Sequence, residues 1–142
     1  MLYTLANRVW HGILFHFKKT FLKIRSHQDA YSVMNSFWKY KCDNEVEYSI
    51  LMTLDILDQV DSIIIHSVGS KKYVEIDTYK VVSHLHDRNK RQFYLAHNHP
   101  NNRLSPSKDD VDLTKYIFSW TGIFGIELLG HMILTDQSYQ LI

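Results

Sequence analysis

The chain has 142 residues, of which 45% are hydrophobic and 22% charged, and its formal net charge is +1. This length and composition suit one domain with a moderate core. The single cysteine, Cys42, excludes a disulfide framework, a cysteine-based zinc site and the two-cysteine zinc motif of nucleobase deaminases. Because the sequence shows neither a cleavable signal peptide nor a run of about 18 uncharged apolar residues, we expect a cytoplasmic location.

The N-terminal segment is the most basic part of the chain. Residues 1–42 contain seven basic residues and one acidic residue, whereas the remainder contains nine basic and fourteen acidic residues. Apolar side chains in this segment recur at helical spacing, for example at Leu5, Val9 and Ile13. We therefore predict a basic amphipathic helix over residues 1–25 that docks on the domain, mediates a dimer contact, or lies on a membrane or phosphate surface. Nucleic acid stays open as a partner of this segment.

Residues 26–142 alternate between strand and helix signals. Alternating side chains and short apolar runs predict strands over 47–55, 59–67, 92–96, 126–134 and 139–142. Capping residues followed by helical spacing predict helices over 28–40, 77–87 and 107–120. This order of elements predicts an α+β (mixed α/β) domain in which one central sheet lies against helices.

Two histidines and one aspartate stand at the junction between the strand that begins near Gln92 and the helix that follows it. Residues i and i+2 of a strand face the same side, so His97 and His99 would present two imidazoles together. Ser107 is typical of a helix N-cap, and Asp110 follows in the first turn. Each half of the pattern is common by itself, since Ser-x-x-Asp is often only a cap. Joined by a short loop, the two halves favour a His-His-Asp zinc site with water in the fourth position.

The spacing His97-x-His99-x7-Ser107-x-x-Asp110 resembles the JAMM motif of the JAB/MPN metallopeptidases, and its wording is similar to the RadC branch of that family. The similarity extends from about Glu47 to Asp136 and includes Gly69-Ser70, Thr114 and His131. It implies a JAB/MPN-like central sheet flanked by helices. It also implies that Glu47 is the general base, with Glu45, on the same face of the strand, as the fallback.

The expected chemistry is hydrolysis of an amide bond. One Zn²⁺ per chain, held by His97, His99 and Asp110, would lower the pKa of its water toward about 7. Glu47 would accept the proton, and Ser107 would donate a hydrogen bond to the oxyanion. The substrate would be a protein or peptide, and in the wider family the bond is often an isopeptide to a ubiquitin-like tail. The alternatives are a non-proteolytic metal-bearing module that binds protein or nucleic acid, and a mononuclear iron oxygenase.

The chain departs from the RadC pattern at three places. Asn101-Asn102-Arg103 stands where Ser-Gly-Asp is usual, so we expect a change in substrate fit rather than in zinc binding. Gly130 stands where an aspartate often precedes the late histidine, so we expect a supporting role of that aspartate to be lost. Residues 1–44 do not resemble the helix-hairpin-helix DNA-binding module of longer RadC proteins, so a DNA-repair role gains no support.

Overall fold

A mixed sheet forms the middle layer of the computed structural model, which describes residues 14–15 and 22–142. Six strands of the described residues have the order β1-β3-β2-β4-β5-β6. They are β1 (Leu14–Phe15), β2 (Tyr48–Leu54), β3 (Val60–Val68), β4 (Gln92–Asn98), β5 (Glu127–Leu134) and β6 (Tyr139–Leu141). Only β4 and β5 run parallel, and every other neighbouring pair is antiparallel.

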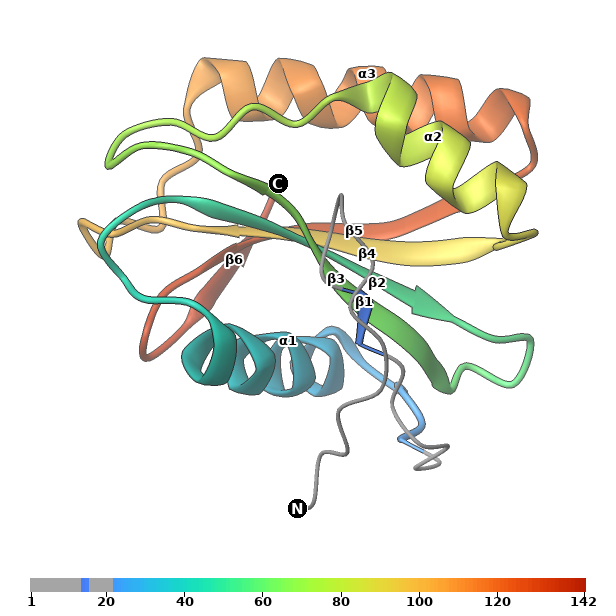
Figure 1. Cartoon of the computed structure of the whole chain (residues 1–142), viewed down its shortest axis with the longest axis horizontal. Coiled ribbons are helices and arrows are strands. Elements are labelled where there is room, and N and C mark those ends of the chain that lie inside the picture. Colours follow the sequence, from blue (N-terminus) through green and yellow to red (C-terminus); the bar gives the residue numbers. More distant parts are fainter. Residues whose placement is uncertain (1–13, 16–21) are drawn as a thin grey trace.

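Helices cover both faces of this sheet (Figure 1). One face packs against α1 (His27–Lys41), and the other packs against α2 (Thr78–Asp87) and α3 (Lys108–Ile123). The α1 side buries Met34 and Trp38 with Met52 of β2, and the opposite side buries Leu51 of β2 with Ile117 of α3. Because successive strand residues point to opposite faces, β2 contributes alternately to both cores. The predicted mixed α/β architecture is confirmed.

The N-terminal helix is the main point at which the structure departs from the sequence prediction. Most of that helix falls on residues 1–13 and 16–21, which lie outside the described residues. Leu14 and Phe15 instead pair with β3 as β1, and Lys23 forms a β-bridge with Gln59. The prediction is wrong for these residues, because the edge of β3 presents backbone groups that an extended segment satisfies. The division of the chain at residue 25 stays a prediction.

Two surface features bear on the expected surroundings of the protein. Among the helices of the described residues, none combines the length and the apolar character needed to span a membrane. The cytoplasmic location stays a prediction.

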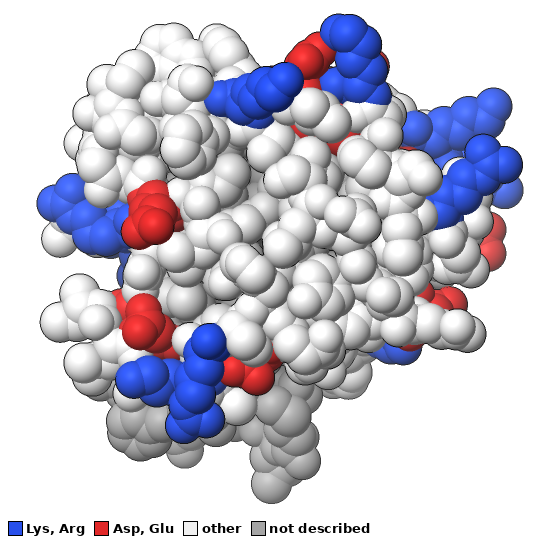
Figure 2. Space-filling view, turned by 180° about the vertical axis from the view of Figure 1, so that it is seen from behind, with Lys and Arg blue, Asp and Glu red and all other residues white. Residues whose placement is uncertain are grey.

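On the described part of the face in Figure 2, uncharged residues occupy the centre, and the Lys and Arg side chains lie around the edge together with Asp and Glu. That face therefore offers no continuous basic stripe in its described part.

Candidate metal centre

His97 and His99 lie where β4 ends, between β2 and β5. The register pairs Ser49 of β2 with His97, which places His97 on the sheet face that α2 and α3 cover. The His97 side chain is 1% exposed, and its Nε2 lies 3.0 Å from Nε2 of His99. Pro100 follows directly and cannot donate to a sheet ladder, so the chain leaves the strand here. The two imidazoles lie together, as the spacing predicted, and they meet at their Nε2 atoms.

The first turn of α3 brings Asp110 to the same point. Ser107 and Asp110 form a capping box, in which Oδ2 of Asp110 accepts the Ser107 N–H and the Ser107 hydroxyl, both at 2.7 Å. Ser107 Oγ in turn accepts the Asp110 N–H at 3.1 Å. This arrangement leaves Oδ1 of Asp110 directed at His97, 3.3 Å from its Nε2. In this structure the single hydroxyl proton of Ser107 is given to Asp110, and a role toward an oxyanion stays a prediction.

The three donor groups fit a tetrahedral metal ion. His97, His99 and Asp110 each offer one ligand atom, and these atoms lie within 4.8 Å of one another. Two ligands that bind zinc at 2.0–2.1 Å in tetrahedral geometry stand about 3.3 Å apart. The Nε2–Nε2 distance is 3.0 Å, and Nε2 of His97 lies 3.3 Å from Oδ1 of Asp110, both close to that value. Nε2 of His99 lies 3.9 Å from the other carboxylate oxygen, Oδ2.

The partners of the two Nδ1 atoms, on the side of each imidazole away from the proposed metal ion, also support a metal site. Nδ1 of His99 lies 2.7 Å from the backbone oxygen of Arg103, which can only accept, so Nδ1 carries the proton. Burial lowers the pKa of His97 below its ordinary value, which favours the neutral ring. Nδ1 of His97 lies 2.9 Å from Nε2 of His131. Partners at Nδ1 leave the Nε2 lone pair for a cation, as in most histidine metal ligands.

Glu47 lies immediately before β2, on the same face as the histidine pair. Its side chain is 8% exposed, and its backbone bonds with Gly69 and Ser70 hold it beside the loop that follows β3. Burial raises the pKa of the Glu47 carboxyl, His99 opposes that shift, and Asp110 adds to it. A buried carboxylate with a raised pKa suits proton transfer near neutral pH. Glu45, the fallback, is exposed, so the structure favours Glu47 over it.

Asn98 is a structural residue of the site that sequence reasoning missed. Its side chain is fully buried, its Oδ1 accepts the Tyr48 N–H at 2.7 Å, and its Nδ2 donates to Val46 O at 3.0 Å. These bonds tie the end of β4 to the segment that carries Glu47. The sequence could have indicated this role, because Asn98 lies two residues after Ala96 and so falls on the same face of the strand. A polar side chain on a buried face needs hydrogen-bond partners.

His131 and Thr114 are also part of the site, although the sequence pointed to them only through the resemblance. His131 is 1% exposed and lies behind His97, and its Nδ1 lies 2.6 Å from Thr114 Oγ1. A Cβ at position 130 would lie 3.1 Å from Leu141 and from Tyr94, both of which pack on the α1 side. Position 130 therefore faces the side of the sheet opposite to His131, and the expected loss of a supporting aspartate stays a prediction.

The site opens onto a groove of about 690 Å³. Glu47, His99 and Asp110 line it together with residues 72–76 of the loop between β3 and α2 and with Arg103. The Asn101-Asn102-Arg103 departure lies along this groove. Asn102 has φ 56°, a left-handed conformation that asparagine tolerates better than most residues and that glycine adopts freely.

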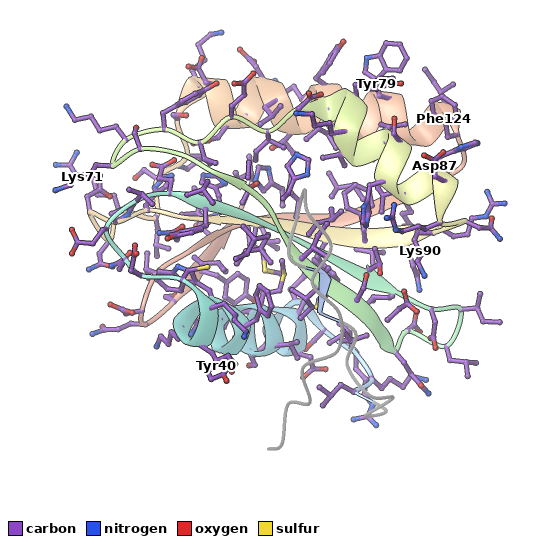
Figure 3. The ribbon with its side chains drawn as sticks, viewed as in Figure 1. Tyr40, Lys71, Tyr79, Asp87, Lys90 and Phe124 are labelled. Carbon is purple, nitrogen blue, oxygen red and sulfur yellow. The ribbon has the colours of Figure 1, made fainter. Side chains whose placement is uncertain are left out.

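A second hollow, of about 420 Å³, lies between α2 and α3. It is lined by Tyr79, Asp87 and Phe124, among others, and includes none of the three proposed ligands. Figure 3 shows Tyr79, Asp87 and Phe124 at the opposite end of the helical layer from Lys71, which belongs to the loop that runs on to the groove. The groove at the metal set is therefore the candidate active site.

The fold and the site define a mixed α/β domain that carries a candidate mononuclear metal centre of the His-His-Asp type. The family model described as "RadC-like JAB domain" matches residues 24–141. The chain therefore belongs to the RadC-like JAB domain family.

Several relatives that match the chain carry the name UPF0758. The UPF0758 protein FN0909 of Fusobacterium nucleatum is 30% identical over 67% of this chain and 41% of its own length. The UPF0758 protein YsxA of Bacillus subtilis is 26% identical over 82% of this chain and 49% of its own length. A UPF0758 protein of Aquifex aeolicus is 27% identical over 85% of this chain and 51% of its own length. The chain thus spans about half the length of these curated relatives.

Proposed function

We propose that this chain is a zinc-dependent hydrolase that cleaves a peptide or isopeptide bond. One observation carries the proposal: the buried carboxylate of Glu47 lines the same groove as His99 and Asp110, which converge with the buried His97. The family supports it as well, because JAB domains can bind zinc and the wider superfamily includes metalloproteases.

Each residue of the site has a separate role in the proposed hydrolysis. Bound at His97, His99 and Asp110, zinc supplies Lewis acidity for the scissile carbonyl and lowers the pKa of the attacking water. Glu47 accepts the proton of that water and passes it to the leaving amine. Ser107 turns its hydroxyl proton from Asp110 to the developing oxyanion. The Ser107 N–H, 2.7 Å from Asp110 Oδ2, keeps the carboxylate in place during this turn.

We propose a polypeptide segment as the substrate that this groove accepts. Its volume of about 690 Å³ lies well within the range of ligand sites, and its walls carry both charges, with Lys72 and Arg103 beside Glu75 and Asp109. An unfolded protein segment and an isopeptide-linked tail, such as that of a ubiquitin-like protein, are both segments of this kind. The chain spans about half the length of its curated relatives. A protein or peptide partner for the whole protein is therefore proposed together with the reaction.

Glu47→Gln separates metal binding from catalysis, because the amide keeps the size of the side chain and loses its basicity. With zinc-loaded protein, we expect turnover of an unfolded carboxymethylated protein or of a fluorogenic lysine-isopeptide substrate to fall at least about 100-fold. Zinc content, measured by mass spectrometry of the metal, should stay at the wild-type level. Glu45→Gln is the matched control, because Glu45 is exposed and lies two residues earlier.

Two results would contradict the proposal. One is a Glu47→Gln variant that keeps more than half of the wild-type turnover, and the other is zinc-loaded wild-type protein that cleaves neither substrate. Retained partner binding without cleavage would support the non-proteolytic alternative instead.

A further inference from the structure

His131 joins the two elements that carry the proposed ligands. Its Nε2 lies 2.9 Å from Nδ1 of His97 on β4, and its Nδ1 lies 2.6 Å from Oγ1 of Thr114 on α3. Thr114 Oγ1 in turn donates to the backbone oxygen of Asp110 at 2.7 Å. With the 3.3 Å contact between Asp110 Oδ1 and His97 Nε2, these contacts close a ring through four residues.

The direction of each hydrogen bond in this ring follows from proton counting. A threonine hydroxyl has one proton, and the Asp110 carbonyl can only accept, so Thr114 gives its proton there. Thr114 Oγ1 must then accept from His131, which places a proton on Nδ1 of His131. His131 is 1% exposed, and no carboxylate is among the hydrogen-bond partners that the described residues give it, so a charged ring would be costly.

A neutral imidazole has only one N–H, so Nε2 of His131 is an acceptor. It accepts from Nδ1 of His97, and His97 then has its lone pair on Nε2. His99, protonated on Nδ1, also has its lone pair on Nε2, 3.0 Å away, and Oδ1 of Asp110 lies 3.3 Å away. Three acceptors therefore converge with no donor between them, which is the arrangement that a bound cation satisfies. A proton on Nδ1 of His131 is therefore what makes His97 a metal ligand. The same hydroxyl that sets this proton also holds the backbone of Asp110, one helical turn earlier.

We propose that Thr114 and His131 are positioning residues of the metal centre: Thr114 sets the tautomer of His131, and His131 sets the tautomer of His97. The inference rests on the proposed metal centre. Hydrogen-bonding partners behind metal ligands commonly contribute 10–100-fold to metal affinity. Without the Thr114 hydroxyl, His131 is free to carry its proton on Nε2, which would push the His97 proton onto the ligand atom.

Thr114→Val tests this relay, because valine keeps the branched shape and removes the hydroxyl. Thr114→Ser restores a hydroxyl and is the rescue variant. Ser119→Ala is the matched control, because Ser119 Oγ donates to Lys115 O at 2.8 Å in the same helix with the same i−4 geometry. Within the described part of the chain, Ser119 has no hydrogen bond to a histidine. Two readouts are needed: zinc affinity by competition with a chromogenic chelator, and imidazole ¹⁵N chemical shifts of the metal-free protein, which report the tautomer.

For Thr114→Val we expect zinc affinity to fall about 10–100-fold and His131 to lose its Nδ1–H tautomer. Thr114→Ser and Ser119→Ala should both keep the affinity within about threefold and the wild-type tautomer. The inference would be overturned by a wild-type His131 protonated on Nε2, or by a Thr114→Val variant with unchanged affinity. If wild-type protein bound no zinc, the proposed function would be wrong, and the metal-free spectra would still decide whether Thr114 sets the His131 proton.

Discussion

At the scale of single residues, Asn98 shows how a buried polar side chain can hold a site together without touching a ligand. It lies between the two histidines in the chain, and its amide points away from them to the segment before β2. Its hydrogen bonds with the Tyr48 N–H and the Val46 oxygen are long-range bonds, 50 and 52 residues apart. Glu47, between these two residues, is thereby fixed relative to His97 and His99.

Asn98→Ala should lower the free energy of unfolding by about 1–3 kcal/mol, because it leaves a partly buried N–H and a partly buried carbonyl without this partner. Urea denaturation of the metal-free protein measures this loss. Asn101→Ala is the control, since Asn101 is exposed and accepts one N–H within its own turn. A loss below about 1 kcal/mol for Asn98→Ala would show that water or a small rearrangement satisfies these groups.

At the scale of elements, α2 carries a titratable group that makes its packing sensitive to pH. His84 is partly buried, and its Nε2 has no hydrogen-bond partner among the described residues. Burial, with the positive charge of Arg88 as a smaller cause, lowers the pKa of His84 to about 4. The unfolded chain has the ordinary value of about 6.5, so it binds more protons than the folded protein between these two pH values.

The stabilising effect of a neutral His84 is therefore fully present above about pH 6.5 and lost as the pH falls through 4. Between pH 6.5 and pH 4, we expect the free energy of unfolding to fall by on the order of 2 kcal/mol less in His84→Gln than in wild type. Denaturant titrations of metal-free protein at several pH values measure the difference. His86→Gln is the control, because that side chain is exposed on the same helix. Parallel pH curves for wild type and His84→Gln would contradict the assignment.

At the scale of the whole molecule, local patterns predicted the elements but not which of them become neighbours. The runs that became β2, β4 and α3 were recognisable because each buries one face or both, and the spacing of His97, His99 and Asp110 predicted their convergence. The contact between His97 and His131 spans 34 residues and depends on the parallel pairing of β4 with β5. Nothing local to either strand encodes that pairing.

The same reason explains the error near the N-terminus. Apolar spacing predicted a helix there, whereas Leu14 and Phe15 take their backbone partners from the edge of β3, about fifty residues later in the chain. An edge strand of two residues leaves almost no periodic signal, and the partner that selects it is invisible to a local pattern.

The proposed metal centre would join β4 to α3 and would give the groove its chemistry. The most direct test is the zinc content of purified, zinc-loaded and chelator-washed protein, compared between wild type, Asp110→Ala and Asp109→Ala. Asp109 is the control, since it is the neighbouring acidic residue of the same turn and is exposed. We expect about one zinc per chain in wild type and Asp109→Ala, and none retained in Asp110→Ala. Wild-type protein without zinc, or Asp110→Ala with the full wild-type content, would contradict the proposed metal centre.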